Sequence, residues 1–187
     1  MENHSGYFVL NKERKEKVIV ILLLIITVFS CKNTENEKEV VFFNKSKEVV
    51  ESKFPFPIGY VNDYEDMFTN DEEQKLEKLI DDYEKESTNV IAVVTVSSYQ
   101  PYDNIEDYSL ALANDWGVGR KDKNNGLTIV INKLKREIRI STGLGTEETL
   151  TDEICKKVID SVIVPEFKNE NYYRGIEKGI GSLIKQW

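Results

Sequence analysis

The chain has 187 residues, 33 of them acidic and 25 basic, and a formal net charge of −8. An acidic surface repels phosphate backbones and attracts cations, so we expect no nucleic-acid partner. The one histidine is His4, which excludes a Ser-His-Asp triad or a His-ligated zinc site from the rest of the chain. A metal held there would be a hard cation bound by oxygen atoms.

The amino-terminal segment carries basic residues, then an apolar run over residues 18–29, then Ser30 and Cys31. This run is shorter than the ~20 residues that cross a bilayer, and the layout is typical of a secretory signal. Residues 28–31 resemble a lipobox, which predicts that Cys31 is lipidated and that residues 1–31 are a lipoprotein-type signal. An uncleaved membrane anchor is the alternative. Both interpretations place the protein in the cell envelope, exported and membrane-anchored, on the periplasmic or surface side.

Residues 32–53 are mostly polar and charged, which predicts a flexible spacer. Residues 54–187 are then one domain of ordinary size. Within that range 25 residues are acidic and 16 are basic, which gives a charge of −9. We expect this domain to be a monomer.

The domain opens with a predicted strand over residues 58–61. Thr69 or Asn70 then caps a helix whose apolar residues recur at helical spacing. The β-branched run at 90–96 predicts a central strand that is covered on both faces. Helical spacing returns over 103–116, with Asp103 as the expected cap. Residues 117–126 are rich in glycine and polar side chains and predict a long loop.

The second half of the domain begins with a predicted antiparallel hairpin of residues 127–131 and 138–141. A helix follows from residues 150–153 to near Pro165, with Cys155 on its apolar side, and a last helix from Tyr172 runs to the chain end. The order βαβαββαα predicts an α/β fold, a single three-layer α/β/α domain with a small mixed sheet.

Five segments, in this order along the chain, resemble the TPM domain family: Val61-Asn62-Asp63-Tyr64, Asp115-Trp116-Gly117-Val118-Gly119-Arg120, Asn125-Gly126, Gly143-Leu144-Gly145 before Leu150-Thr151-Asp152, and Pro165-Glu166-Phe167 with Tyr172-Tyr173-Arg174-Gly175. The resemblance covers residues 58–187. It implies an extracytoplasmic domain; some family members are described as binding calcium, and plant thylakoid relatives as acid phosphatases.

The chain departs from the family pattern at two places. Glu65-Asp66 stands where family members often have Ala-Gly, and Glu148 replaces a glycine after Glu147. Many members also carry a membrane helix and a glycine-rich tail after the domain. This chain stops at Trp187, so we expect the amino-terminal tether to be the anchor.

In an open α/β sheet, ligands bind outside the carboxyl ends of the parallel strands. Four loops with oxygen-bearing side chains are expected to meet there and to form a site for Ca²⁺, or for Mg²⁺. The predicted ligands are Asp63, Asp122, Asn124, Asn125, Glu147 and Asp152.

Each of these residues also has a structural interpretation. Asp63 could stabilise a turn, Asn125-Gly126 could be a turn into a strand, and Asp152 could be an acid at a helix start. A metal-dependent phosphatase would use Asp63 or Asp122 as base and Arg120 on the phosphate.

Three hypotheses about function follow. The first is a tethered domain that binds a divalent cation and supports interactions with another envelope protein. The second is a metal-dependent acid phosphatase of broad specificity. The third is a metal-independent interaction module whose crevice takes a peptide or a terminus of a partner.

Overall fold

The computed structural model describes residues 53–187, which belong to one compact unit. The predicted signal segment, Cys31 and all but the last residue of the predicted spacer lie outside the described residues. Among residues 53–187 no helix is both long enough and apolar enough to span a bilayer.

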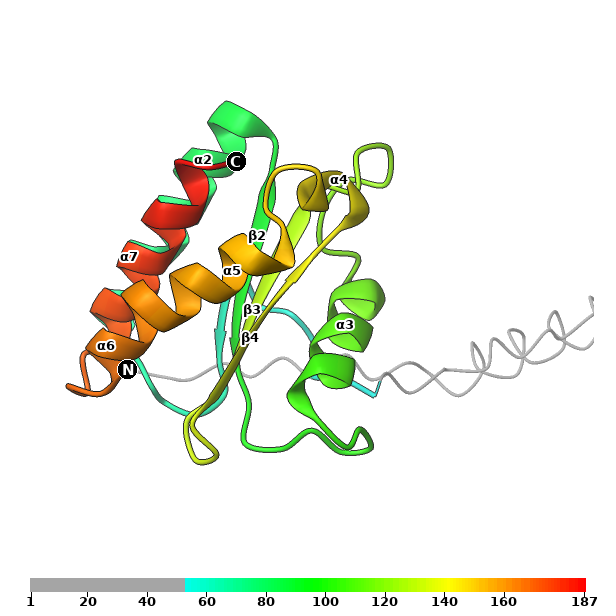
Figure 1. The fold of residues 1–187 in the computed structure, drawn as a ribbon. Coiled ribbons are helices and arrows are strands. Elements are labelled where there is room, and N and C mark those ends of the chain that lie inside the picture. Colours follow the sequence, from blue (N-terminus) through cyan, green and yellow to red (C-terminus); the bar gives the residue numbers. More distant parts are fainter. Residues whose placement is uncertain (1–52) are drawn as a thin grey trace, which may run out of the picture. The chain divides into compact units, whose positions relative to one another are not determined.

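The centre of the domain is a four-stranded mixed sheet in the order β1-β2-β3-β4 (Figure 1). The strands are β1 (Val61–Asp63), β2 (Val90–Thr95), β3 (Gly126–Asn132) and β4 (Glu137–Thr142). The first three are parallel and β4 pairs with β3 in the antiparallel sense. Every residue of β3 is buried, because helices cover both faces of this inner strand.

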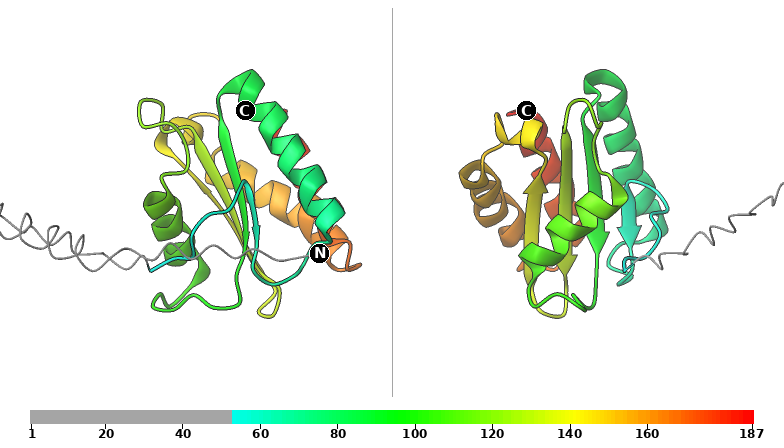
Figure 2. Two further views of the ribbon diagram at one scale, coloured as in Figure 1. Left: turned by 180° about the vertical axis from the view of Figure 1, so that it is seen from behind. Right: turned by 90° about the vertical axis from the view of Figure 1, so that its right-hand side faces the viewer.

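Helices cover both faces of the sheet (Figure 2). One face carries α2 (Asn70–Ser87), α5 (Asp152–Val158), the π-helical turn η1 (Ile159–Ile163), α6 (Val164–Phe167) and α7 (Tyr172–Ile184), and the other carries α3 (Ile105–Trp116). A short helix, α4 (Leu144–Glu147), follows β4. The predicted three-layer α/β/α fold is confirmed.

Side-chain caps fix the starts of three helices. Thr69, one of the two caps that the sequence allows, caps α2 in a capping box with Glu72. Thr151 caps α5. The cap of α3 is Asn104, whose side-chain oxygen accepts a 2.8 Å hydrogen bond from the Asp107 amide. The prediction of Asp103 as this cap is therefore wrong by one residue.

Two element boundaries differ from those that the sequence predicts. The first strand is residues 61–63 rather than 58–61, because Asn62 closes a turn with the Ile58 amide and the Gly59 carbonyl. The helix predicted to end near Pro165 continues through α6 to Phe167. The π-helical turn before Pro165 supplies the irregularity that a proline within a helix requires.

Two hydrophobic clusters, one on each face of the sheet, form the core. The cluster under α3 includes Phe54, whose ring stacks on Tyr102 and meets Tyr108 edge-on. Trp116 Nε1 donates a 3.0 Å hydrogen bond to the Pro55 carbonyl. The domain therefore begins at about Phe54, before its first strand.

Candidate functional site

The six predicted metal ligands do not meet in one crevice. Asp63, at the carboxyl end of β1, pairs in register with Thr95 of β2. Thr95 in turn pairs with Ile131 of β3. Gly126, the first residue of β3, pairs with Val90, which lies five residues before Thr95 on β2. At ~3.3 Å per strand residue, the loop before Gly126 lies ~17 Å from Asp63 along the sheet. The prediction of one site at the carboxyl ends of the strands is therefore wrong for Asp122, Asn124 and Asn125.

The prediction failed because β3 runs parallel to β1 and β2. A loop that precedes a parallel strand reaches the amino-terminal edge of the sheet, whereas Asp63 follows its strand. Glu147 lies at the same edge as Asn125, since the Gly143 amide that begins its loop bonds the Gly126 carbonyl. Figure 1 shows α4 and the loop before β3 at the upper edge and the β3–β4 hairpin at the lower one.

Asp152 lies in a third place, beside the open edge of β4. Its carboxylate faces Arg139 Nη2 at 3.5 Å, and Arg139 also reaches Glu106 on α3 at 3.2 Å. As the first residue of α5 it stabilises the positive end of the helix dipole. This is the structural interpretation offered for Asp152 from the sequence.

Asp63 holds its own turn together. One carboxylate oxygen accepts hydrogen bonds from Thr95 Oγ1 at 2.5 Å and from the Glu65 amide at 3.3 Å, and the other accepts a 2.7 Å bond from the Phe68 amide. Glu65 in turn accepts a 2.9 Å bond from the Lys133 amide. Asp63 thus ties the loop after β1 to β2, while Glu65 ties it to the β3–β4 hairpin.

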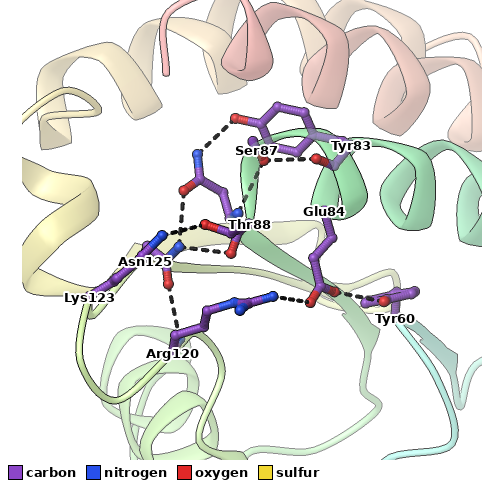
Figure 3. A network of polar contacts seen from close by, with 9 residues as sticks. Tyr60, Tyr83, Glu84, Ser87, Thr88, Arg120, Lys123 and Asn125 are labelled. Atoms are coloured by element: carbon purple, nitrogen blue, oxygen red, sulfur yellow. Dashed lines mark hydrogen bonds and ion pairs between the residues drawn. The ribbon is translucent and has the colours of Figure 1, made fainter.

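Asn125 is the centre of a polar network at the opposite edge (Figure 3). Its amide nitrogen donates to the Thr88 carbonyl at 2.8 Å and to Asn89 Oδ1 at 3.1 Å, and its oxygen accepts a 3.0 Å bond from the Arg120 amide. Lys123 Nζ donates to Thr88 Oγ1 at 2.7 Å. These bonds lock the loop before β3 onto the end of α2.

Arg120 belongs to the same network and points at a carboxylate. Its guanidinium lies 3.7 Å from Glu84 Oε1, and Tyr60 donates a 2.6 Å hydrogen bond to Glu84 Oε2. That bond raises the pKa of Tyr60 to about 12. The Arg120 amide is bonded to Asn125, so the backbone of Arg120 lies at the edge opposite Asp63. Of the two bases that the phosphatase hypothesis allowed beside Arg120, Asp63 is therefore remote, whereas Asp122 lies in the same loop as Arg120.

The glycines of the TPM-like segments pack backbone against backbone. A Cβ on Gly126 would lie 2.0 Å from the Val118 carbonyl oxygen, and one on Gly145 would lie 2.0 Å from that of Lys123. A Cβ on Gly143 would lie 2.2 Å from the Asn124 carbonyl oxygen. These glycines allow the loop before β3 to touch the loop after β4, so their role at this edge is close packing.

Within residues 53–187 no three histidine, cysteine, aspartate or glutamate side chains are grouped closely enough to hold one metal ion. Like charges do crowd one region near Asp63. Burial raises the pKa of Glu73, and the charges of Asp63, Asp66 and Glu77 raise it further. None of the salt bridges formed by residues 53–187 involves these four carboxylates.

The cysteine of the described domain is not a nucleophile. Cys155 is 3% exposed, as its position on the apolar side of the helix predicted. Burial, and after it the charge of Asp152, raises the pKa of its thiol to about 11. The thiol therefore stays protonated at neutral pH and packs as a small hydrophobic side chain.

A cavity of about 390 Å³ opens at the carboxyl-terminal edge of the sheet, between the β3–β4 hairpin and the turn that joins α6 to α7. The buried part of its lining consists of the apolar Met67 and Ile131, which form its floor, and the polar Asn132, and the apolar walls are half-buried. The complete lining is Met67, Ile131, Asn132, Lys133, Arg136, Glu137, Ile138, Val164, Phe167, Lys168, Glu170 and Tyr172.

The rim of this cavity carries exposed charged side chains. Lys133, Arg136 and Lys168 are basic, and Glu137 and Glu170 are acidic. The salt bridges among residues 53–187 include none of these five. The local charge is +1 in a domain of net charge −9, so this is a positive place on an acidic protein.

Two aromatic contacts arrange the lysines of the hairpin. Lys133 Nζ lies 4.9 Å from the centroid of the Tyr172 ring, and Lys135 Nζ lies 4.1 Å from that of Tyr99. Tyr99 also donates a 2.8 Å hydrogen bond to Glu137 Oε2, which engages one of the two acids of the rim. Lys133 and Glu137 of the rim are thus each engaged by a tyrosine, which leaves Arg136 and Lys168 facing the single acid Glu170.

Sequence reasoning missed this cavity because its residues are spread over four segments. The helix of residues 150–165 and the hairpin were both predicted, but how they pack against each other was not. One signal was present: the turn Lys133-Leu134-Lys135-Arg136 places three basic residues together in a strongly acidic domain.

Comparison with known proteins identifies the domain. The family model of the TPM domain matches residues 61–186. A solved N-terminal domain of a protein from P. gingivalis is 30% identical, with a TM-score of 0.61, and the match covers 67% of this chain and 80% of that one. No curated protein matches the chain.

Two further solved structures share the fold. The N-terminal domain of the cg2496 protein from Corynebacterium glutamicum is 20% identical, with a TM-score of 0.54, over 72% of this chain and 84% of that one. The BA42 protein from the psychrophile Bizionia argentinensis is 18% identical, with a TM-score of 0.55, over 66% and 83%. The two N-terminal domains were solved as separate domains in solution. The family model matches residues 61–186, and the fold and the five sequence segments agree with that match. This chain therefore belongs to the TPM domain family.

Proposed function

We propose that this TPM domain is a binding module that takes a segment of another envelope protein into the cavity at the carboxyl-terminal edge of the sheet. The cavity carries this proposal, because it joins a buried apolar floor to a rim with three basic side chains that form no salt bridge within residues 53–187. Its volume of about 390 Å³ is at the lower end of the ~300–1,000 Å³ range of ligand pockets.

The position of the cavity also supports the proposal. In open α/β folds, ligands bind outside the carboxyl ends of the parallel strands, and Ile131 at the end of β3 forms part of the floor. The lining comes from the hairpin, from Met67 after β1 and from both sides of the α6–α7 turn. Separate segments therefore converge on this place, as the predicted metal ligands do not.

A peptide selection tests the proposal on a fragment of residues 49–187. The hydrophobic clusters lie within this fragment, and the related N-terminal domains fold on their own. Two libraries of random heptapeptides would be used, one with free carboxyl ends and one joined to its carrier through the carboxyl end. We expect selected peptides to shift the amide NMR signals of Ile138, Phe167 and Tyr172.

Two variants locate the binding. Ile138→Trp places a large ring at the half-buried wall and should abolish peptide binding, whereas Leu144→Ala removes an exposed side chain at the opposite edge and should leave it unchanged. The proposal is wrong if neither library yields a peptide, or if the selected peptides bind Ile138→Trp as well as the unaltered domain.

A second candidate is weak binding of Ca²⁺ or Mg²⁺ near Asp63, as the family resemblance implies. The crowding of Asp63, Asp66 and Glu73 favours it, since the pKa of Glu73 is raised by burial and then by these neighbouring charges. Because no three such side chains within residues 53–187 could hold one ion directly, the cation would keep part of its hydration shell.

A calcium titration followed by amide NMR tests this candidate. We expect shifts near Asp63 and Asp66 that Asp66→Asn removes. Asp66 has a φ of 49°, a conformation that asparagine also tolerates, so this variant removes charge and keeps the backbone. Asp122→Asn, at the opposite edge, is the matched control. Shifts that are spread over every acidic face and vanish in moderate salt would refute the candidate.

A further inference from the structure

We infer that the segment taken into the cavity is the carboxyl terminus of a partner protein, with an apolar last side chain on the floor and its terminal carboxylate at the basic rim. This inference rests on the proposed function and adds the chemistry of the ligand. It is carried by the pairing of an apolar cavity with the side chains of Arg136 and Lys168 at its mouth.

The charges at the rim favour a single negative charge. The domain as a whole is strongly acidic, so an anionic peptide is repelled except where cations gather. Lys133, Arg136 and Lys168 supply such a place. The net charge of +1 at the rim attracts an anion, and a carboxylate, with one negative charge, loses less hydration on binding than a dianion such as a phosphate group does.

The geometry of a chain end fits the cavity better than that of an internal acidic residue. In a last residue the carboxylate and the side chain are attached to the same Cα, so one residue supplies both the apolar group and the anion. An internal acidic residue would need the chain to continue on both sides. The hairpin and the α6–α7 turn flank the cavity on two sides. A peptide that ends in the cavity leaves it in one direction only, whereas an internal segment must leave it in two.

Two charged residues of the rim have an unusual backbone conformation. Arg136 has a φ of 58° and Glu170 a φ of 61°, in the left-handed region that favours glycine. The chain keeps a charged side chain at both places, one on each side of the cavity. Thr88 and Asn124, which also have positive φ, belong to the edge where Asn125 forms its network.

The first turn of α7 adds to the positive field on the cavity. Tyr172, its first residue, lines the cavity, and the Asn171 side chain makes no capping bond to the helix. The first turn holds no acidic residue, whereas α2, α3 and α5 each have a side-chain cap and acids in their first turn. The amide groups of α7 contribute positive potential at the cavity, which is partly offset by the Glu166 carboxylate that accepts a 3.2 Å hydrogen bond from Asn171 Nδ2.

Matched peptides test the inference on the fragment of residues 49–187. The probe is an acetylated pentapeptide, Gly-Ser-Gly-Ser-Phe, with a free carboxyl end, compared with the same peptide as a carboxyl-terminal amide and with a version that ends in serine. We expect the free acid to bind at least about tenfold more tightly than the amide, because a charge-assisted hydrogen bond is lost in the amide. The peptide ending in serine should also bind more weakly.

Three variants and one fatty acid test whether the basic rim causes the preference for the free acid over the amide. Arg136→Asn tolerates a positive φ and removes the guanidinium, so the ratio of the two dissociation constants should fall towards one. Arg136→Lys should keep most of the preference, and Leu134→Ala, exposed on the same hairpin, should keep all of it. Dodecanoate is the alternative ligand with the same end group.

The outcomes separate the inference from the function on which it rests. Equal binding of the free acid and the amide, with loss of both in Ile138→Trp, would overturn the terminal-carboxylate inference and leave the peptide-binding function in place. Binding of dodecanoate without binding of any peptide would overturn both. A preference for the free acid that Arg136→Asn leaves intact would also overturn the assignment of the rim.

Discussion

The amide nitrogen of Gly145 donates a 3.1 Å hydrogen bond to the carbonyl oxygen of Asn124, which joins the loop after β4 to the loop before β3. Gly145 lies in a segment that resembles the TPM family, and Asn124 directly precedes another such segment, Asn125-Gly126. A second bond, from the Gly143 amide to the Gly126 carbonyl at 2.8 Å, runs beside it. The two glycine-rich segments are therefore two halves of one packed edge.

Gly126→Ala should disrupt this edge. The new Cβ would lie 2.0 Å from the Val118 carbonyl oxygen, and backbone atoms cannot move aside as a flexible side chain can. We expect a loss of about 3 kcal/mol or more of unfolding free energy, beyond the usual cost of overpacking. Urea unfolding followed by circular dichroism measures it. A loss below about 1 kcal/mol would show that this backbone contact is not fixed.

Gly181→Ala is the matched control for that substitution. Gly181 lies inside α7, and nothing lies within 4 Å of the position that its Cβ would take. Alanine is the better helix former, so this variant should gain about 0.5–1 kcal/mol in the same experiment. The opposite signs of the two glycine substitutions would separate close packing from helix propensity.

Asn125→Ala should destabilise the domain without a direct effect on the cavity. The substitution leaves the Thr88 carbonyl and the Arg120 amide without their partner at a position that is 6% exposed. We expect a cost of about 2–3 kcal/mol, the penalty for buried polar groups left unpaired. Peptide affinity at the opposite edge should stay the same under native conditions. If calcium protects the unaltered domain and not this variant, a cation role for Asn125 would replace the structural one.

Glu73→Gln should stabilise the domain slightly at neutral pH. The pKa of Glu73 is raised in the folded state, by burial first and then by neighbouring carboxylates, so folding takes up protons at this site. The unfavourable contribution is present above the folded pKa and absent below the pKa of the unfolded chain. The melting temperature of Glu73→Gln should therefore exceed that of the unaltered domain at pH 7 and equal it near pH 3. A gain that persists unchanged at pH 3 would contradict the electrostatic cause.

The thiol of Cys155 should react only when the domain opens. The side chain is 3% exposed and burial raises its pKa to about 11. In the fragment of residues 49–187, which lacks Cys31, labelling by a disulfide reagent at pH 8 should follow the unfolding equilibrium. Urea near the unfolding midpoint should restore the rate of a free thiol. Fast labelling without denaturant would show that α5 opens locally.

Much of the fold could be predicted from the sequence because it depends on local patterns. The β-branched run 90–96 and the periodicity of residues 70–87 state which faces are buried, and Thr69 and Thr151 mark helix starts by their own side-chain chemistry. Two predicted boundaries were wrong, the strand at residues 58–61 and the helix cap at residue 103. Both depend on side-chain hydrogen bonds, of Asn62 and Asn104, that pair nearby backbone groups in place of regular secondary structure.

The sequence by itself determined the fold class, the family and which residues are buried, since hydrophobic spacing and caps act within one element. Only the tertiary structure decided where the polar residues meet. The direction of β3 placed Asn125 and Asp63 at opposite edges of the sheet, and no spacing in the sequence encodes that separation. The cavity likewise exists because the hairpin and the α6–α7 turn pack side by side, so that Arg136 and Lys168, 32 residues apart in the chain, border the same apolar floor.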